Sequence, residues 1–78
     1  MATAEQIRSY IERTHGKTVG NDDSLLDSGI LDSVAIFELV SFLEDTFGIK
    51  IDDESIIPEN FETVTLVAAF VDRKRAAA

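Results

Sequence analysis

The chain has 78 residues, no cysteine and a formal net charge of −8. This length favours a single domain over residues 1–78, and the absence of cysteine excludes disulfides and thiolate metal sites. Apolar residues make up 45% of the chain, enough for a packed core, and no apolar run is long enough for a transmembrane helix or a secretion signal. We therefore expect a soluble, cytoplasmic, globular protein that does not enter the membrane.

The acidic residues are concentrated in the middle of the chain. Residues 21–62 hold twelve Asp and Glu but only one base, Lys50, and the other six bases lie nearer the two ends. Phosphate binding needs clustered Lys and Arg, so nucleic acid is excluded as a partner. An acidic middle favours partners with basic patches, but acid also keeps a small protein soluble. Charge alone leaves both interpretations open.

Residues 4–15 are predicted to form the first helix. Thr3 and Gln6 fit a capping box, the apolar residues that follow have helical spacing, and Gly16 marks the end. The long connection over residues 16–31 is rich in Gly, Asp and Ser. It also contains four aliphatic residues, so we expect it to be pinned across the core, with a helical turn near residues 24–27. These aliphatic residues are Leu25, Leu26, Ile30 and Leu31.

Residues 33–47 are predicted to form the second helix, followed by Gly48 as the residue just past its end. At 100° per residue the buried stripe consists of Ile36, Val40, Leu43 and Phe47, with Leu39 beside it. The opposite face carries Val34, Phe37, Glu38, Ser41, Glu44 and Asp45. Two exposed apolar residues among acids could form a small docking spot, although single exposed apolar residues usually need no explanation.

The last third of the chain reads as short pieces followed by a final helix. Residues 49–51 are expected to be an extended connector that buries Ile49 or Ile51, and residues 52–57 and 58–61 to form single helical turns. Thr63 is the expected cap of the last helix, whose inner face is Val64, Val67, Ala68 and Val71. The bases at 73–75 suit the C-terminal end of that helix. The predicted fold is all-α, a small four-helix bundle with three main helices, one short helix and a long first loop.

Catalytic and metal-binding patterns do not fit this chain. His15 is the only histidine, and G-x-S-x-G, H-E-x-x-H and Gly-rich phosphate motifs are missing. An EF-hand aligned on Gly29 would place Leu26 at a ligand position and Ala35 at the position of the bidentate acid. We therefore expect no catalytic residue, no metal site and no enzyme activity.

Two residues that can cap a helix, Asp32 and Ser33, stand side by side at the start of the second helix. If Asp32 is the N-cap, Ser33 becomes the first helical residue and its hydroxyl is free to point outward. A phosphate attached there would sit at the positive end of the helix. Serine near a helix start is usually only a cap, so the pattern alone does not assign a function.

The stretch LLDSGILDSVAIFELVSFLEDTFGIKID resembles the centre of acyl carrier and peptidyl (aminoacyl) carrier proteins. The family motif Asp-Ser-Leu reads Asp32-Ser33-Val34 here, and PENFETV (58–64) is similar to the family's junction between its third and fourth helices. The resemblance covers about residues 4–74, which we take as the core of the carrier domain. It implies an acyl-carrier fold.

The resemblance also implies a function for Ser33. In this family the serine hydroxyl carries 4′-phosphopantetheine, transferred from coenzyme A by a phosphopantetheinyl transferase, and its thiol holds an acyl or aminoacyl group as a thioester. The second helix is the recognition helix, which here points to Val34, Phe37, Glu38, Ser41, Glu44 and Asp45 as partner-binding residues. The implied partners are an acyl- or aminoacyl-loading ligase and downstream synthase enzymes with basic docking patches.

Two residues depart from the family pattern: Val34 replaces the usual Leu, and Phe37 is bulky for an exposed site. The chain is expected to be a monomer of the freestanding type, closer to aminoacyl carriers than to fatty-acid carriers. A fatty-acid carrier needs a cavity that the phenylalanines at 42, 47, 61 and 70 could fill. The alternative is a carrier-like acidic interaction module without cofactor. Charge reversal at Glu38 or Glu44 is expected to weaken transfer to partners without unfolding the protein.

Overall fold

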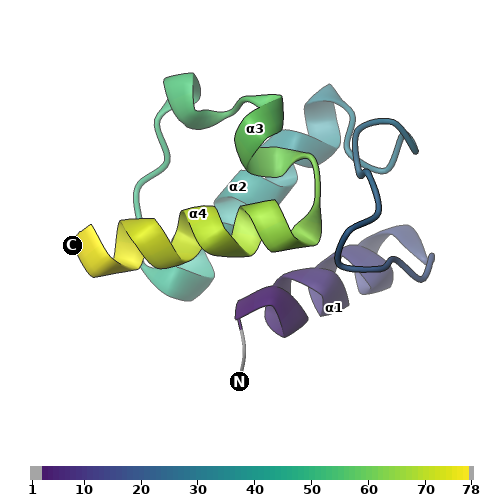
Figure 1. Cartoon of the computed structure of the whole chain (residues 1–78), viewed down its shortest axis with the longest axis horizontal. Helices are drawn as coiled ribbons and strands as arrows, with labels where there is room; N and C mark the ends of the chain where they lie inside the picture. The colour runs from purple at the N-terminus through teal and green to yellow at the C-terminus, as the bar shows by residue number, and fades with distance from the viewer. Residues whose placement is uncertain (1–2, 78) are drawn as a thin grey trace.

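The computed structural model describes residues 3–77, apart from the side chains of Ser33 and Ala77. The chain forms α1 (Thr3–His15), α2 (Ser33–Phe47), the 3₁₀ helix η1 (Asp53–Ser55), α3 (Pro58–Phe61) and α4 (Val64–Ala77). Residues 3–77 contain no strand. The predicted all-α fold, with three main helices, one short helix and a long first loop, is confirmed (Figure 1).

Helices α1 and α4 pack against each other in opposite directions. The Thr3 hydroxyl, at the start of α1, donates a hydrogen bond of 2.9 Å to Asp72 Oδ1, near the end of α4. The predicted capping box is therefore wrong, because Thr3 lies inside the helix and its hydroxyl reaches a different helix.

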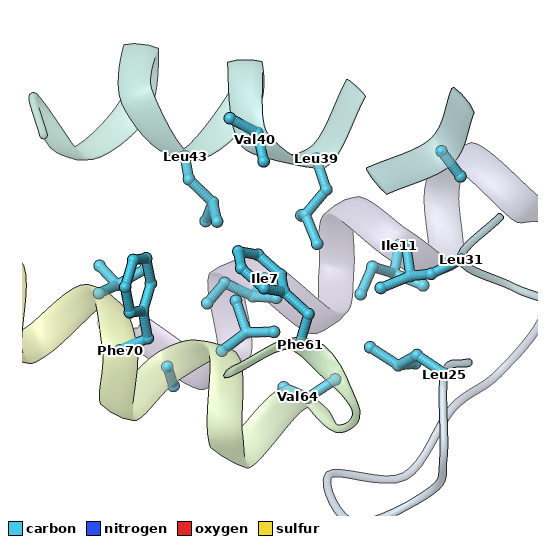
Figure 2. Close-up of a cluster of buried hydrophobic side chains, with 14 of the residues drawn as sticks. Ile7, Ile11, Leu25, Leu31, Leu39, Val40, Leu43, Phe61, Val64 and Phe70 are labelled. Atoms are coloured by element: carbon cyan, nitrogen blue, oxygen red, sulfur yellow. The ribbon is translucent and has the colours of Figure 1, made fainter. Parts of the chain in front are cut away.

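Helices α2 and α4 run in the same general direction, because η1 and α3 return the chain across the molecule between them (Figure 1). Leu39 of α2 lies toward Phe61, and Leu43 lies toward Phe70 of α4 (Figure 2). Three segments therefore lie together at one end of the bundle: helix α3, the start of α4, and the loop that precedes α2 (Figure 1).

The buried face of α2 is turned slightly from the predicted one. Leu39 and Leu43 are fully buried, whereas Ile36 and Phe47 are only half-buried. Leu39 is thus at the centre of the stripe and not beside it, because Phe61 packs on that side. The inner face of α4 is confirmed as predicted, and Phe70 is buried with it.

Aromatic side chains join α1 to α2. The rings of Tyr10 and Phe42 are stacked, with centroids 4.1 Å apart and an angle of 16° between their planes. Phe47 meets Phe42 edge-on, with centroids 6.4 Å apart. At the end of the bundle, the Arg75 guanidinium lies 5.5 Å from the Phe47 ring centroid and links the last turns of α4 and α2.

The connector after α2 is buried more thoroughly than expected. Ile49 and Ile51 are both buried, although the sequence predicted only one of them. The predicted turns that follow are confirmed as η1 and α3, with Pro58 in the first turn of α3, where its missing N–H costs nothing. Thr63 caps α4 as predicted, since its hydroxyl accepts a hydrogen bond of 3.1 Å from Leu66 N. Along residues 3–77, every helix is too short or too polar to cross a bilayer.

Candidate functional site

Helix α2 begins at Ser33, and Asp32 is its N-cap residue. Asp32 Oδ1 accepts a hydrogen bond of 2.8 Å from Ala35 N, and the Asp32 carbonyl accepts the N–H of Ile36 at 2.9 Å. The predicted capping role of Asp32 is therefore confirmed. The Ser33 side chain lies outside the described part of the structure, so the direction of its hydroxyl stays a prediction.

The loop that leads to Ser33 is tightly folded. Ser24 starts the predicted helical turn, since its hydroxyl accepts the N–H of Asp27 at 3.1 Å and its carbonyl accepts the N–H of Ser28 at 3.3 Å. Gly29 then reverses the chain with a φ of 79°, a conformation that favours glycine. The predicted pinning across the core is confirmed, because Leu25, Ile30 and Leu31 are buried and Leu26 is half-buried.

The sequence did not predict where this loop is anchored. Leu25 N donates a hydrogen bond of 2.6 Å to the Glu62 carbonyl, between α3 and α4. Thr65, in the first turn of α4, donates from both its backbone N–H and its hydroxyl to the Asn21 carbonyl, at 3.0 and 3.1 Å. These partners are about forty positions apart in the chain, so no local pattern could have found them.

The face of α2 singled out by periodicity is largely exposed. Val34 and Phe37 expose 68% and 59% of their surfaces, and Glu38, Ser41 and Asp45 are also exposed. Two large apolar side chains next to the helix start are thus exposed on a face that also carries two acids, Glu38 and Asp45. We call these five residues the α2 face.

Glu44 differs from the other acids of this helix. It is half-buried, and its Oε2 atom accepts a hydrogen bond of 2.9 Å from Ile51 N. Its carboxylate therefore holds the connector after α2 against the helix. Because this contact contributes to the fold, Glu44→Lys is expected to lower stability in addition to weakening transfer to partners.

The start of α2 is chemically suited to a covalently attached phosphate. Asp32 Oδ1 takes the N–H of Ala35, which leaves the N–H groups of Ser33 and Val34 without a partner inside the helix. Such N–H donors at the positive end of a helix dipole favour a phosphate group in their vicinity. The residues present thus fit a phosphate-linked arm.

Comparison with known proteins identifies the family. Residues 5–71 match the family described as "PP-binding: Phosphopantetheine attachment site". The D-alanyl carrier protein of Streptococcus pyogenes serotype M1 is 36% identical over 74 residues, covering 92% of this chain and 94% of the relative. The probable acyl carrier protein PigG of a Serratia species is 42% identical over 52 residues, covering 67% of this chain.

Two other similarities differ in how much of the relative they cover. The N-benzoylphenylalaninol synthetase apmA of Penicillium brevicompactum is 32% identical over 92% of this chain. The chain spans only 3% of that synthetase and 60% of the Serratia protein. A solved chain from a crystal structure of an FAD-dependent dehydrogenase has a TM-score of 0.73 and 29% identity, covering 88% of this chain and 97% of the solved one.

The family match covers most of the chain, the helices have the same arrangement as a solved relative, and the start of α2 fits a phosphate-linked arm. The chain therefore belongs to the phosphopantetheine-attachment family, a non-catalytic carrier family to which the similar acyl and D-alanyl carrier proteins belong.

Proposed function

We propose that Ser33 is the attachment residue for 4′-phosphopantetheine and that the chain presents thioester-bound acyl or aminoacyl groups to partner enzymes. The observation that carries this proposal is the capping of α2 by Asp32, which relieves Ser33 of that task. The family match includes position 33, and the Asp32-Ser33-Val34 motif lies at the start of α2, as the resemblance implies.

The attachment step would use the Ser33 hydroxyl as the nucleophile. Its oxygen forms a bond to the β-phosphorus of coenzyme A, the pyrophosphate bond breaks, and adenosine 3′,5′-bisphosphate leaves. The serine proton passes to a base of the transferase, because this chain offers no base in the motif other than the Asp32 carboxylate, which is engaged as the cap. Once attached, the arm supplies a terminal thiol that forms thioesters.

Intact-mass measurement tests the proposal. Incubation of the purified chain with coenzyme A and a broad-specificity phosphopantetheinyl transferase should add one phosphopantetheine, and Ser33→Ala should abolish the addition. Ser9→Ala is the matched control, since Ser9 is an exposed serine of α1 that does not belong to the α2 face, and its loss should leave the modification intact. Modification of Ser33→Ala would contradict the assignment. If several transferases leave the wild type unmodified, the alternative of an acidic interaction module without cofactor is favoured.

We further propose that partners dock on the α2 face. Val34 and Phe37 supply apolar contact area beside the attachment residue, and Glu38 and Asp45 supply charge that basic patches would match. The expected partners are the transferase, a loading ligase and the enzymes that act on the loaded thioester. The similarity to a chain from an FAD-dependent dehydrogenase structure makes such a dehydrogenase a partner to test.

The favoured cargo is a short aminoacyl group. The D-alanyl carrier is similar along nearly its whole length, which supports a freestanding aminoacyl carrier. The space between α2 and α4 is also occupied by Phe61 and Phe70, which are 1% and 5% exposed (Figure 2). These rings would have to move before a long acyl chain could enter between the helices. Mass spectrometry of the loaded protein from its native host would identify the cargo, and a long fatty acyl thioester would contradict this assignment.

A further inference from the structure

We propose that Thr65 is a positioning residue for the modification of Ser33. Thr65 lies at the start of α4 and holds the loop that leads to Ser33. This inference rests on the proposed attachment at Ser33. It assigns a function to α4 that α2 does not supply. Helix α4 fixes the position of the loop residues directly before Ser33 when a transferase binds.

The Thr65 hydroxyl binds the loop in the half that follows α1. It lies 3.1 Å from the Asn21 carbonyl oxygen and 3.2 Å from Asp22 Oδ1, so its one hydrogen is shared between two successive loop residues. The Asn21 side chain is held from the other side, where its Oδ1 accepts a hydrogen bond of 3.3 Å from the Arg8 guanidinium of α1. Asn21 is therefore fixed between α1 and α4.

Two further backbone hydrogen bonds hold the part of the loop between Asn21 and Ser33. Leu25 N donates to the Glu62 carbonyl at 2.6 Å, and the Leu25 carbonyl accepts from Leu31 N at 3.0 Å. Leu31 is directly followed by Asp32, the cap of α2. The path from the α3–α4 junction to the attachment residue thus runs through Leu25, whose side chain is fully buried (Figure 2).

This geometry predicts how loss of the anchor affects modification. Without the Thr65 hydroxyl, Asn21 is held on the α4 side by the Thr65 N–H alone, so this contact opens more often and a smaller fraction of the molecules presents Ser33 in the competent position. The apparent KM rises by the inverse of that fraction, while kcat at saturation is unchanged. Because Thr65 is exposed and its backbone N–H still binds Asn21, we expect a KM increase of about threefold.

The test compares wild type with Thr65→Val and Thr65→Ser, measuring KM and kcat of phosphopantetheine transfer for each carrier. Thr65→Val keeps the shape and the backbone N–H but loses the hydroxyl, and Thr65→Ser restores it and should return KM to the wild-type value. Hydrogen exchange at the amides of Leu25 and Leu31 reports the anchor directly. We expect faster exchange there in Thr65→Val, with unchanged exchange in the core of α2.

Thr63→Val is the matched control, since Thr63 lies at the same junction but its hydroxyl caps α4 by accepting from Leu66 N. It should lower stability without changing KM. The proposal is overturned if Thr63→Val raises KM equally, if loop exchange rises in Thr65→Val while KM stays constant, or if KM rises without any change in loop exchange. Absence of modification in the wild type would contradict the attachment at Ser33 itself.

Discussion

Helices α1 and α2 end in the same way, although they lead to different parts of the fold. The sequences ERTHGKTV (12–19) and EDTFGIKI (44–51) both place a Glu four positions before a Gly and seven before a buried aliphatic residue. We call them the α1 exit and the α2 exit. Gly16 and Gly48 have φ values of 69° and 66°, and each donates its N–H to the carbonyl of the Glu, at 2.8 and 3.0 Å.

The Glu carboxylates complete the similarity. Glu12 Oε2 accepts the N–H of Val19 at 3.0 Å, just as Glu44 Oε2 accepts that of Ile51. The α1 exit then leads into the loop that carries Ser33, whereas the α2 exit leads to η1 and α3 (Figure 1). An acid on a proposed docking helix can therefore stabilise the fold. Glu44 and Glu38 are both acids of α2, but only Glu44 has a partner at a helix exit.

Loss of either exit carboxylate should have the largest effect on stability. In Glu12→Ala and Glu44→Ala the half-buried N–H of Val19 or Ile51 loses its acceptor, so we expect a loss of about 1–2 kcal/mol for each. The exits lie at opposite ends of the bundle, so the two losses should add (Figure 1). Urea denaturation measures them. A double variant no less stable than either single variant would show that the exits are not independent.

Replacement of either exit glycine by alanine should lower stability by a similar amount. A Cβ atom at Gly16 or Gly48 would meet nothing within 4 Å, so the only penalty of Gly→Ala is the left-handed backbone. We expect a loss of about 1–2 kcal/mol at each position, nearly equal at the two. Thermal unfolding followed by circular dichroism checks this. Clearly unequal losses would mean that the two exits differ in a way the backbone does not reveal.

Charge reversal on α2 should separate fold from docking. Glu38→Lys changes an exposed charge, so stability should shift by less than about 0.5 kcal/mol while the rate of transfer to a partner falls. Glu44→Lys should lower stability, because the ammonium cannot accept the Ile51 N–H. Asp45→Lys is a second docking variant on the exposed side. Equal transfer rates for wild type, Glu38→Lys and Asp45→Lys would count against the α2 face.

Salt should produce the smallest and most selective effect. Docking between an acidic face and a basic patch is screened by added salt, so transfer rates of wild type should fall as sodium chloride is raised, and those of Glu38→Lys should fall less. The stability difference between wild type and Glu44→Ala should change little, since a carboxylate bonded to a half-buried N–H is screened less. Transfer rates that do not depend on salt would contradict an electrostatic docking step.

Local signals made most of the fold predictable. The predicted and observed bounds of α2 agree, because Asp32 and Gly48 mark its ends through side-chain and backbone hydrogen bonds that act within a few residues. The packing of the loop also followed from its aliphatic residues. Its anchor to Glu62 and Thr65 did not, because those contacts join segments about forty positions apart. The function of Glu44 was missed, although the repeated Glu-Gly-aliphatic spacing of the two exits would have indicated it.

The stack of Tyr10 on Phe42 makes the protein suitable for label-free optical measurements. The chain has one tyrosine and no tryptophan, so a single residue dominates its near-ultraviolet absorption and its intrinsic fluorescence. That residue lies at the contact between α1 and α2, with its ring 4.1 Å from that of Phe42. Any event that separates the two helices, including the entry of a bulky cargo, would therefore change the emission of one defined chromophore.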